Sequence, residues 1–303
     1  MTPPAGEGPT AERPYGIAPP GYRLPDALRL GRVRLQVADL ARSLAYYDQV
    51  IGMRVLARGA GTATLGAHGD DTPLLELHER PGVSPVPRRG RLGLYHFAIL
   101  LPDRAALGRF VRHLADIGAH AGMADHLVSE AVYLTDPDGL GIEVYADRPR
   151  ESWRHESRQL RMTTDPLDVA DLVRAGGDAP WTGLPPGTRI GHVHLFVGDL
   201  AQAAAFYHAG LGLDQVVWGY PGALFLSAGG YHHHLGTNTW AAGAAPAGEQ
   251  DARLLEWEIL LPAVTDAHAA LDSLAAGGAA VERADDGGLA RDPWGTAVRI
   301  RGG

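Results

Sequence analysis

The chain repeats itself at a constant offset of 160 residues. Residues 34–53 (RLQVADLARSLAYYDQVIGM) match 194–213 (HLFVGDLAQAAAFYHAGLGL), and 98–103 (AILLPD) match 258–263 (EILLPA). Agreement over this length predicts two copies of one structural unit and excludes most single-unit folds. The positions shared by the first pair include Val37 and Val197, Asp39 and Asp199, Leu40 and Leu200, Tyr47 and Tyr207, and Gly52 and Gly212.

Each half in turn contains two smaller units. A unit starts with an alternating strand, such as Arg32–Val37 or His96–Leu101, continues with an amphipathic helix and closes with three short strands between Gly and Asp turns. This pattern predicts four βαβββ modules and an α+β fold. The expected modules span 31–80, 93–147, 190–241 and 254–301, with helices at Leu40–Val50, Arg104–Gly118, Leu200–Ala209 and Val264–Ala276.

Two segments lie outside the modules. Residues 1–27 are rich in Pro and Gly without periodicity, which predicts a mobile N-terminal arm. Residues 148–188 are expected to be a linker with one short helix near Leu167–Arg174. The predicted domains are therefore 28–147 and 189–303.

Composition and net charge limit the classes of partner and of metal site that this chain can have. Apolar residues make up 45% of the chain and the net charge is −8, so we expect a globular protein whose partner is neither nucleic acid nor a membrane. No apolar run reaches the roughly 18 residues of a membrane span, and the start shows no signal-peptide core, which predicts a cytoplasmic protein. Because cysteine is absent and there are 14 histidines, any metal must be held by His, Asp or Glu.

The strand–helix openings of the form V-x-D-L-x-x-S/A-x-x-F/Y-Y resemble those of the vicinal oxygen chelate superfamily, which includes glyoxalase I, antibiotic-resistance proteins and extradiol dioxygenases. The resemblance covers about residues 30–301 and implies two glyoxalase-like domains with cupped mixed β-sheets. Openings of this type identify the superfamily well and the activity poorly.

Residues 126–143 (HLVSEAVYLTDPDGLGIE) are similar to the more specific signature of type I extradiol ring-cleaving dioxygenases, with Ala124 as the one departure. The segments 231–240 (YHHHLGTNTW) and 93–103 (GLYHFAILLPD) resemble the catechol 2,3-dioxygenase branch found in bacilli. This resemblance implies an enzyme that inserts O2 into a small aromatic diol beside its hydroxyls, as in aromatic hydrocarbon catabolism. The product would be a muconic semialdehyde.

In this superfamily each module offers inward positions on its first and last strands. Arginine cannot bind a cation, so pairing modules within either half leaves an incomplete ligand set. Pairing the second and third modules joins His96, Glu143 and His192, a 2-His-1-carboxylate triad of the kind that binds Fe(II) and leaves three positions open. Mn(II) accepts the same ligands, so the choice between the two ions stays open.

The first and fourth modules would then place Arg32, Glu256 and Arg299 at the equivalent positions, with Glu76 as a less certain neighbour. Two interpretations stay open for the first three. They form either a decayed site in which a charge cluster has replaced the metal, or simple surface positions.

The resemblance also implies roles around the metal. The acid–base histidine of the family aligns best with His233, with His232 and His234 left open for the same role, while His126 and Tyr133 match positions that bind substrate or oxygen. Strand alternation would place His232 and His234 on the face opposite His233. The residues predicted to line the substrate pocket are His194, His232, His234, Asn238 and Trp240.

Other functions of the superfamily remain as alternatives. A glyoxalase-like lyase would need a fourth protein ligand, and a hydroquinone dioxygenase would share the metal but not the substrate. A metal-free resistance protein that sequesters a planar ligand would lack the triad. Members of the family are often homo-oligomers, and the sequence does not set the number of subunits.

Overall fold

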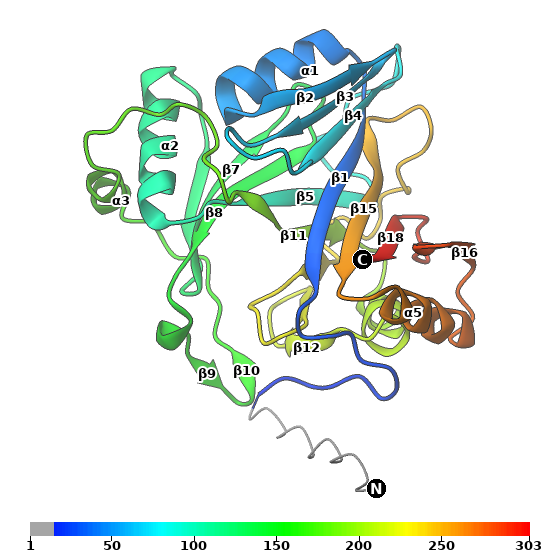
Figure 1. Ribbon diagram of the computed structural model, residues 1–303. Coiled ribbons are helices and arrows are strands. Elements are labelled where there is room, and N and C mark those ends of the chain that lie inside the picture. The colour runs from blue at the N-terminus through cyan, green and yellow to red at the C-terminus, as the bar shows by residue number, and fades with distance from the viewer. Residues whose placement is uncertain (1–14) are drawn as a thin grey trace, which may run out of the picture.

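The computed structural model describes residues 15–303 and consists of two eight-stranded mixed sheets with helices around them. Each sheet takes one module from each half of the chain, as Figure 1 shows for β1 (blue) and β15 (orange), which lie side by side. The predicted α+β class of four βαβββ modules is confirmed.

The first sheet, here called the 2–3 sheet, joins the second and third modules. Its central pair, β5 and β11, runs antiparallel, and each of these strands has a parallel partner on its other side. Its strands in spatial order are β12 (Asp214–Val217), β13 (Ala223–Ser227), β14 (Leu235–Asn238), β11 (Arg189–Phe196), β5 (Gly93–Leu100), β8 (Gly141–Asp147), β7 (Ser129–Thr135) and β6 (Gly122–Asp125).

The second sheet, here called the 1–4 sheet, repeats this arrangement around the antiparallel pair β1 and β15. Its strands in spatial order are β16 (Val281–Ala284), β17 (Gly287–Arg291), β18 (Ala297–Gly302), β15 (Arg253–Leu261), β1 (Arg29–Val37), β4 (Leu75–Glu79), β3 (Thr62–Gly66) and β2 (Arg54–Gly59).

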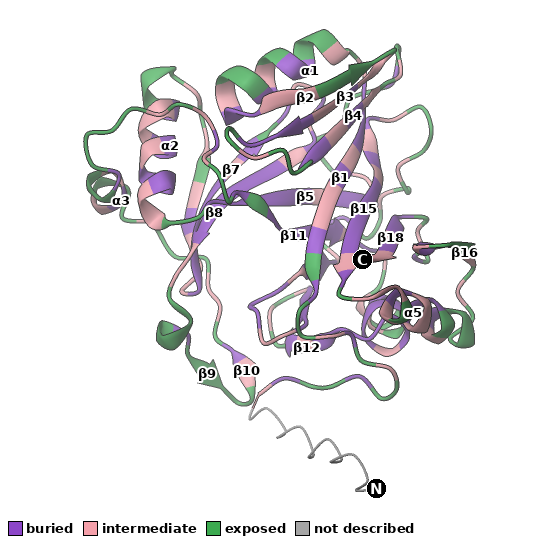
Figure 2. Ribbon diagram, in the orientation of Figure 1, coloured by how far each residue is buried: buried purple, intermediate pink, exposed green. Residues whose placement is uncertain are grey.

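Alternation along the central strands divides each sheet into an apolar and a polar face. On β1, Val33 and Leu35 are fully buried in the main core. Arg32 and Arg34, which alternate with them along the strand, lie on the other face. One apolar cluster contains residues of both sheets and of the helices, so the two sheets share a core. Figure 2 shows this burial along the central strands, with exposed residues along α1, β9 and β16.

The helices begin where the sequence predicts but two of them change type. Helices α1 (Leu40–Tyr46) and α4 (Leu200–Ala203) continue as π-helical turns, η1 (Tyr47–Ile51) and η3 (Ala204–Gly210), a change that apolar periodicity does not register. No helix of the described chain is long and apolar enough to cross a membrane. The other helices are α2 (Arg104–Asp116), α3 (Val169–Ala175), α5 (Val264–Ala276) and the short 3-10 turn η2 (Arg150–Ser152).

The repeated Tyr and Asp of the sequence bond to each other. Tyr47 donates its hydroxyl hydrogen to Asp136 at 3.2 Å, and Tyr207 donates to Asp292 at 3.0 Å. All four side chains are buried. Because Tyr47 belongs to a module of the 1–4 sheet and Asp136 to a module of the 2–3 sheet, the first bond ties the two sheets together.

The predicted mobile arm is wrong for residues 15–27, whereas residues 1–14 lie outside the described chain. Ile17 pairs with Gln215 beside β12, and the Leu24 amide donates to the Gly212 carbonyl at 2.9 Å. Leu24 is only 2% exposed. One apolar side chain in a Pro-rich segment gives no periodic signal, yet it is enough to anchor the segment on the third module. The linker holds a small hairpin, β9 (His155–Glu156) and β10 (Gln159–Leu160), before α3.

Asp136 provides a test of the link between the sheets. Its burial raises the pKa to about 6 from 3.8, although the Leu140 and Asp138 amides and Tyr47 donate to it. The native state therefore holds this proton more tightly than the unfolded chain. The group should contribute about 3 kcal/mol below pH 4, a contribution that is lost as the pH rises through about 6.

Replacing Asp136 by Asn should remove this dependence. Urea unfolding between pH 4 and 7 measures the free energy of unfolding of the variant and of the wild type. The variant should gain stability relative to the wild type as the pH rises. The exposed Asp116→Asn variant is the control and should parallel the wild type. Parallel curves for Asp136→Asn and the wild type would contradict the assignment.

Candidate functional site

Three adjacent strands of the 2–3 sheet bring His96, Glu143 and His192 together. His96 lies on β5, Glu143 on its neighbour β8 and His192 on its neighbour β11, all at alternating positions that face away from the main core. One ligand atom of each lies within 4.8 Å of the others. All three side chains are at most 4% exposed. The grouping is the one that the repeat register predicts for the second and third modules.

The protonation states of these three groups suit a cation. Burial raises the pKa of Glu143, but His192 and His96 outweigh this effect and hold it well below its usual range. Burial lowers the pKa of His96 and His192 even though Glu143 lies beside them. Neutral imidazoles around an ionised carboxylate are the forms that ligate a metal.

Two buried ring nitrogens of the group, His96 Nε2 and His192 Nδ1, have no hydrogen-bond partner among the described residues. His96 Nε2 lies 3.0 Å from Glu143 Oε2, yet no described residue meets it with hydrogen-bond geometry. His192 Nε2 lies 3.1 Å from the same oxygen. A buried polar atom without a partner is costly, and a metal ion among the three residues would satisfy it.

His194 lies next to the triad but is occupied by Asn238. The two side chains are 3.0 Å apart, with the Asn238 amide donating to His194 Nε2. Burial, with His96 and His192 nearby, lowers the pKa of His194 well below its usual range. Asn238 therefore supports a neutral imidazole beside the metal group.

The three consecutive histidines of 232–234 face different surroundings. His232 Nε2 lies 2.9 Å from Asp147 Oδ1, and His232 Nδ1 lies 2.7 Å from His233 Nδ1. A carboxylate only accepts, so a His232 with a single ring hydrogen carries it on Nε2, toward Asp147, and accepts at Nδ1. His233 therefore carries its hydrogen on Nδ1 and has a bare Nε2.

His233 is the member of this run that reaches the candidate site. Its ring centroid is 4.0 Å from that of His192, and it lines the cavity in front of the triad. Burial, together with His192 and His232, lowers its pKa well below the usual range. The neutral ring with a bare Nε2 is suited to take a proton.

The structure places three of the predicted lining residues away from this cavity. His232 lies behind His233, and Asn238 lies behind His194. His234 accepts the Ala228 amide at 3.3 Å and lines a separate surface hollow with Arg150 and Arg189. Strand alternation places His232 and His234 on the face opposite His233, and of these three only His233 lines the cavity.

His126 and Tyr133 meet at the cavity wall. His126 Nδ1 donates to the Thr163 carbonyl at 2.5 Å, so its Nε2 accepts from the Tyr133 hydroxyl, also at 2.5 Å. Burial and the nearby Glu143 raise the pKa of Tyr133 well above its usual range, which keeps the hydroxyl protonated. The linker residue Thr163 thus fixes the orientation of a signature histidine.

The cavity itself has a volume of about 460 Å³. It contains the predicted His126, Tyr133, His194, His233 and Trp240 together with His96 and Glu143. Its other walls were not predicted because they come from strand ends, loops and the linker, where no repeat marks them. These further lining residues are Tyr95, Gly122, Met123, Ala124, Met162, Thr163, Thr164, Tyr220 and Phe225.

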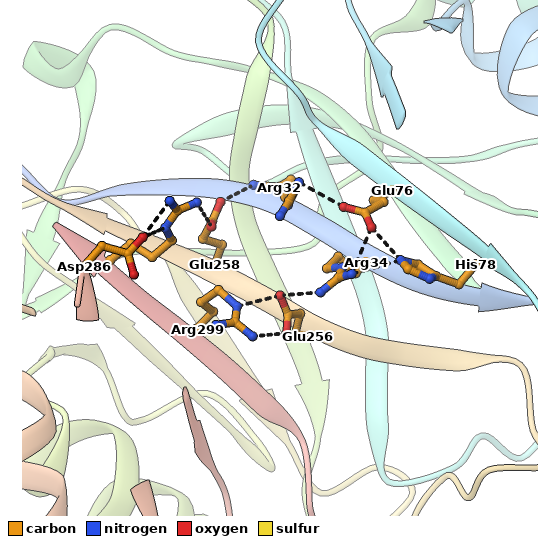
Figure 3. A network of polar contacts seen from close by, with 9 residues as sticks. Arg32, Arg34, Glu76, His78, Glu256, Glu258, Asp286 and Arg299 are labelled. Atoms are coloured by element: carbon orange, nitrogen blue, oxygen red, sulfur yellow. Dashed lines mark hydrogen bonds and ion pairs between the residues drawn. The ribbon is translucent and has the colours of Figure 1, made fainter. Parts of the chain in front are cut away.

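The 1–4 sheet carries a charge cluster at the equivalent positions (Figure 3). Arg299 Nε donates to Glu256 Oε1 at 2.8 Å and its Nη2 to Glu256 Oε2 at 3.0 Å, while Arg32 pairs with Glu76 at 2.9 Å. Arg34 lies between the two acids, 2.9 Å from Glu76 and 3.1 Å from Glu256. Of the two interpretations that the sequence left open for Arg32, Glu256 and Arg299, this arrangement corresponds to the first, in which a charge cluster takes the place of a metal. Among the described residues, the only group with metal-ligand spacing is the triad of the other sheet.

Comparison with known proteins gives one sequence family. Residues 29–144 and 189–300 match the family described as the glyoxalase/bleomycin resistance protein/dioxygenase superfamily. The chain is 43% identical over 268 residues to catechol-2,3-dioxygenase of Bacillus subtilis (strain 168), a match that spans 87% of this chain and 93% of that protein.

Solved structures show the same fold at low identity. A Bacillus subtilis strain 168 protein provisionally assigned as a dioxygenase gives a TM-score of 0.63 at 14% identity, covering 93% of this chain and 86% of that one. Glyoxalase I from Zea mays gives a TM-score of 0.54 at 18% identity, covering 91% and 92%. These two likenesses concern the fold alone.

The charge cluster provides a stability test. Burial raises the pKa of Glu256, but the bonds from Arg299 and Arg34 outweigh it and lower the pKa below 4.5. Replacing Arg34 by Met leaves Glu76 and Glu256 without the cation between them. Because these side chains are partly exposed, we expect a loss of about 2 kcal/mol in the free energy of unfolding at pH 7.

The loss should shrink on acidification. A carboxyl group with a lowered folded pKa stabilises the protein above its unfolded pKa, and this contribution disappears as the pH falls. Urea unfolding at pH 7 and pH 4 measures both values, with the exposed Arg58→Met as the matched control. A variant as stable as the wild type at pH 7 would contradict the structural role of Arg34.

Proposed function

The chain belongs to the glyoxalase/bleomycin resistance protein/dioxygenase superfamily, and within it we propose that it is a non-haem, Fe(II)-dependent extradiol dioxygenase. It would insert both atoms of O2 into a catechol-type ring beside the vicinal hydroxyls and release a muconic semialdehyde. The observation that carries this proposal is the buried facial triad of two histidines and one carboxylate. The 43% identity to a catechol-2,3-dioxygenase over most of both chains supports it.

The residues present fit a metal ion. His96, His192 and Glu143 would hold it, and three ligands leave positions for a diol and for O2. When bound, the ion would act as a Lewis acid on the diol and pass an electron from the diol to O2. Fe(II) is the ion that we propose, and the same ligands also accept Mn(II).

His233 would act as the base. Its bare Nε2 takes a proton from a diol hydroxyl, and the resulting imidazolium returns a proton as the ring opens. His232 and Asp147 hold His233 in the tautomer that this step needs, in the way that a carboxylate orients the histidine of a catalytic triad. His233 is a catalytic residue in this proposal, and His232 and Asp147 are positioning residues.

His126 and Tyr133 would position the substrate or its oxygen. They lie on the cavity wall, and their mutual bond together with the Thr163 carbonyl restricts both side chains. A restricted donor and acceptor beside the ring hold it in one orientation, which favours attack at one carbon.

The alternatives receive less support. A glyoxalase-like lyase needs a fourth protein ligand, and the metal group of the described chain contains three. A metal-free binding protein would bury Glu143 and two neutral histidines without an evident use for them. A hydroquinone dioxygenase shares this site and differs only in substrate. The cytoplasmic location and the homo-oligomer stay predictions.

Ring cleavage tests the function directly. The protein is loaded with Fe(II) without oxygen, and catechol is then added in air-saturated buffer. We expect one iron per chain, one O2 consumed per catechol and a yellow product whose mass equals catechol plus two oxygen atoms. Glu143→Gln should lose both iron and product, while the exposed His120→Ala should keep both. Bound iron without O2 consumption would overturn the proposed function.

The positioning of His233 can be tested separately. Replacing His233 by Gln should lower kcat by at least about 100-fold, because the proton has no other acceptor at that place. Replacing Asp147 by Leu removes the acceptor of the His232 Nε2 hydrogen, so the tautomer of His232 is no longer fixed and kcat should fall by about tenfold with little change in KM. Tyr231→Phe removes the other hydrogen bond to Asp147 Oδ1, 3.1 Å long, and is the matched control.

Nitrogen-15 NMR of the metal-free protein distinguishes positioning from a general loss of structure. The His233 ring should carry its hydrogen on Nδ1 in the wild type and in Tyr231→Phe, and should lose this preference in Asp147→Leu. An unchanged tautomer with an unchanged kcat in Asp147→Leu would contradict the role of the aspartate.

A further inference from the structure

A second hollow borders the side of the histidine run that faces away from the metal group. Its volume is about 220 Å³. We call it the arginine hollow, because Arg29, Arg150 and Arg189 lie around it together with His234. A water molecule takes roughly 30 Å³ of liquid, so the hollow has room for a small ion and not for a nucleotide. Its lining also includes the buried apolar residues Leu28, Leu30, Ile190 and Ala228.

Two of the arginines occupy equivalent positions of the repeat. Arg29 is the first residue of β1, and Arg189 is the first residue of β11, at the offset of 160 residues that relates the two halves. The two strands belong to different sheets and contact each other. Equivalent residues of two copies come together near the axis that relates the copies, so the internal symmetry places two like charges side by side.

The positive charges of the hollow are not paired with acids of the described chain. Neither Arg29 nor Arg189 forms an ion pair with a described residue, and Arg150 donates to the Gly229 carbonyl at 3.3 Å rather than to a carboxylate. The arginines of the charge cluster, by contrast, are paired with glutamates. In a chain with a net charge of −8, such a group of cations is a place that attracts an anion.

One acid belongs to the lining of the hollow. This residue is Asp26, which is exposed and has an interaction partner of its own. Three guanidinium groups against one carboxylate leave two positive charges in excess. An ion with two negative charges would balance them, and oxyanions with this charge accept the paired N–H groups of arginine well.

His234 offers the hollow a neutral donor. Its Nδ1 accepts the Ala228 amide at 3.3 Å, so a ring with one hydrogen carries it on Nε2. Burial, with His232 and Arg150 nearby, lowers the pKa of His234 to about 3, which favours this form at neutral pH. The ring lines the hollow, and no described residue accepts its Nε2 hydrogen. The hydrogen is therefore available to a ligand.

The guanidinium of Arg150 is held in place by aromatic rings. It lies over Trp153 with 5.4 Å to the ring centroid and over Tyr231 with 5.6 Å. Tyr231 is itself buried and fixed by its hydrogen bond of 3.1 Å to Asp147. A guanidinium that stacks on a ring keeps its in-plane N–H groups free for hydrogen bonds, so Arg150 is prepared to bind an oxyanion.

We propose that the arginine hollow is a binding site for a small dianionic oxyanion of the phosphate class, held by its three arginines and by the Nε2 hydrogen of His234. The bound ion would connect the starts of β1 and β11 with the linker and with the loop before β14. It would thereby stabilise the junction of the two sheets. The free ion and the phosphate end of an ester present the same chemistry. The proposal does not depend on the proposed ring-cleavage function.

Calorimetric titration with sodium phosphate at about pH 7.5 tests the proposal. The full Zn(II)-loaded chain, freed of excess metal, is titrated against a background of sodium chloride at matched ionic strength. We expect one phosphate per chain with a dissociation constant below about 1 mM, a similar affinity for sulfate, and at least about tenfold weaker binding of singly charged acetate. Absence of phosphate binding, or acetate binding as tightly as phosphate, would overturn the proposal.

Variants locate the ion. Arg29→Gln and Arg189→Gln each remove one charge and should weaken phosphate binding at least about tenfold. The exposed Arg58→Gln on β2 is the matched control and should bind phosphate as the wild type does. Glu143→Gln, which should lose the metal, should also keep phosphate binding. Unchanged affinity in both hollow variants, or loss of binding in Glu143→Gln, would show that the ion binds elsewhere and overturn the assignment.

The melting temperature gives a second measurement that includes folding. About 10 mM phosphate should raise it by at least about 2 °C over chloride in the wild type and in Arg58→Gln, because the ion binds the folded chain. The rise should disappear in Arg189→Gln. An equal rise in Arg189→Gln would contradict the stabilising role.

Nitrogen-15 NMR of the Zn(II)-loaded protein follows His234 directly. Its Nε2 signal should move when phosphate is added and stay in place in Arg189→Gln. A His234 signal that does not move while phosphate binds would overturn the proposed donor. Methyl phosphate distinguishes the two sources: affinity equal to that of phosphate assigns the hollow to an esterified phosphate end, and at least about tenfold weaker binding assigns it to the free ion. Both results support the oxyanion site.

Discussion

The antiparallel pairing of β5 with β11 is the constraint on which the candidate site depends. It joins the second module to the third, and its register places His96 opposite His194 and His192 opposite Ala98. The parallel partner β8 then brings Glu143 beside Ala98 on the same face. Had each half paired its own modules, the two histidines would lie in different sheets and no complete ligand set would form.

The two sheets show how one scaffold accommodates polar groups in two ways. At equivalent inward positions, the 2–3 sheet has His192, His96 and Glu143, and the 1–4 sheet has Arg32, Glu256 and Arg299. Arginine brings its own cation, so the acids of the 1–4 sheet are paired without a metal and tie β1, β4, β15 and β18 together. The histidines bring lone pairs instead, and these remain available to an external cation.

The sequence could predict those parts of the site that occupy equivalent positions in the repeated modules. The family resemblance implied an inward position on the first and last strand of each module, and the repeat register then selected His96, His192 and Glu143 for these positions. Alternation also separates His233 from His232 and His234, and the assignment of the latter two to the pocket lining departed from that pattern. Thr163 and Met162 could not be found either, because the linker has no counterpart in the repeat and its place depends on the pairing of Asp165 with β6.

This division between module and linker separates two properties of the cavity. The metal group lies on strands whose positions are fixed by the shared core, so a change there would disturb the packing of the fold, and His233 lies on the bend that precedes β14. One part of the cavity wall depends on residues 162–164. These residues are held by the β-bridge between Asp165 and Asp125 and by the hydrogen bond between the Thr164 and Tyr220 hydroxyls. The linker therefore shapes this part of the cavity wall, and through the bond from His126 to the Thr163 carbonyl it also fixes a residue of the proposed chemistry.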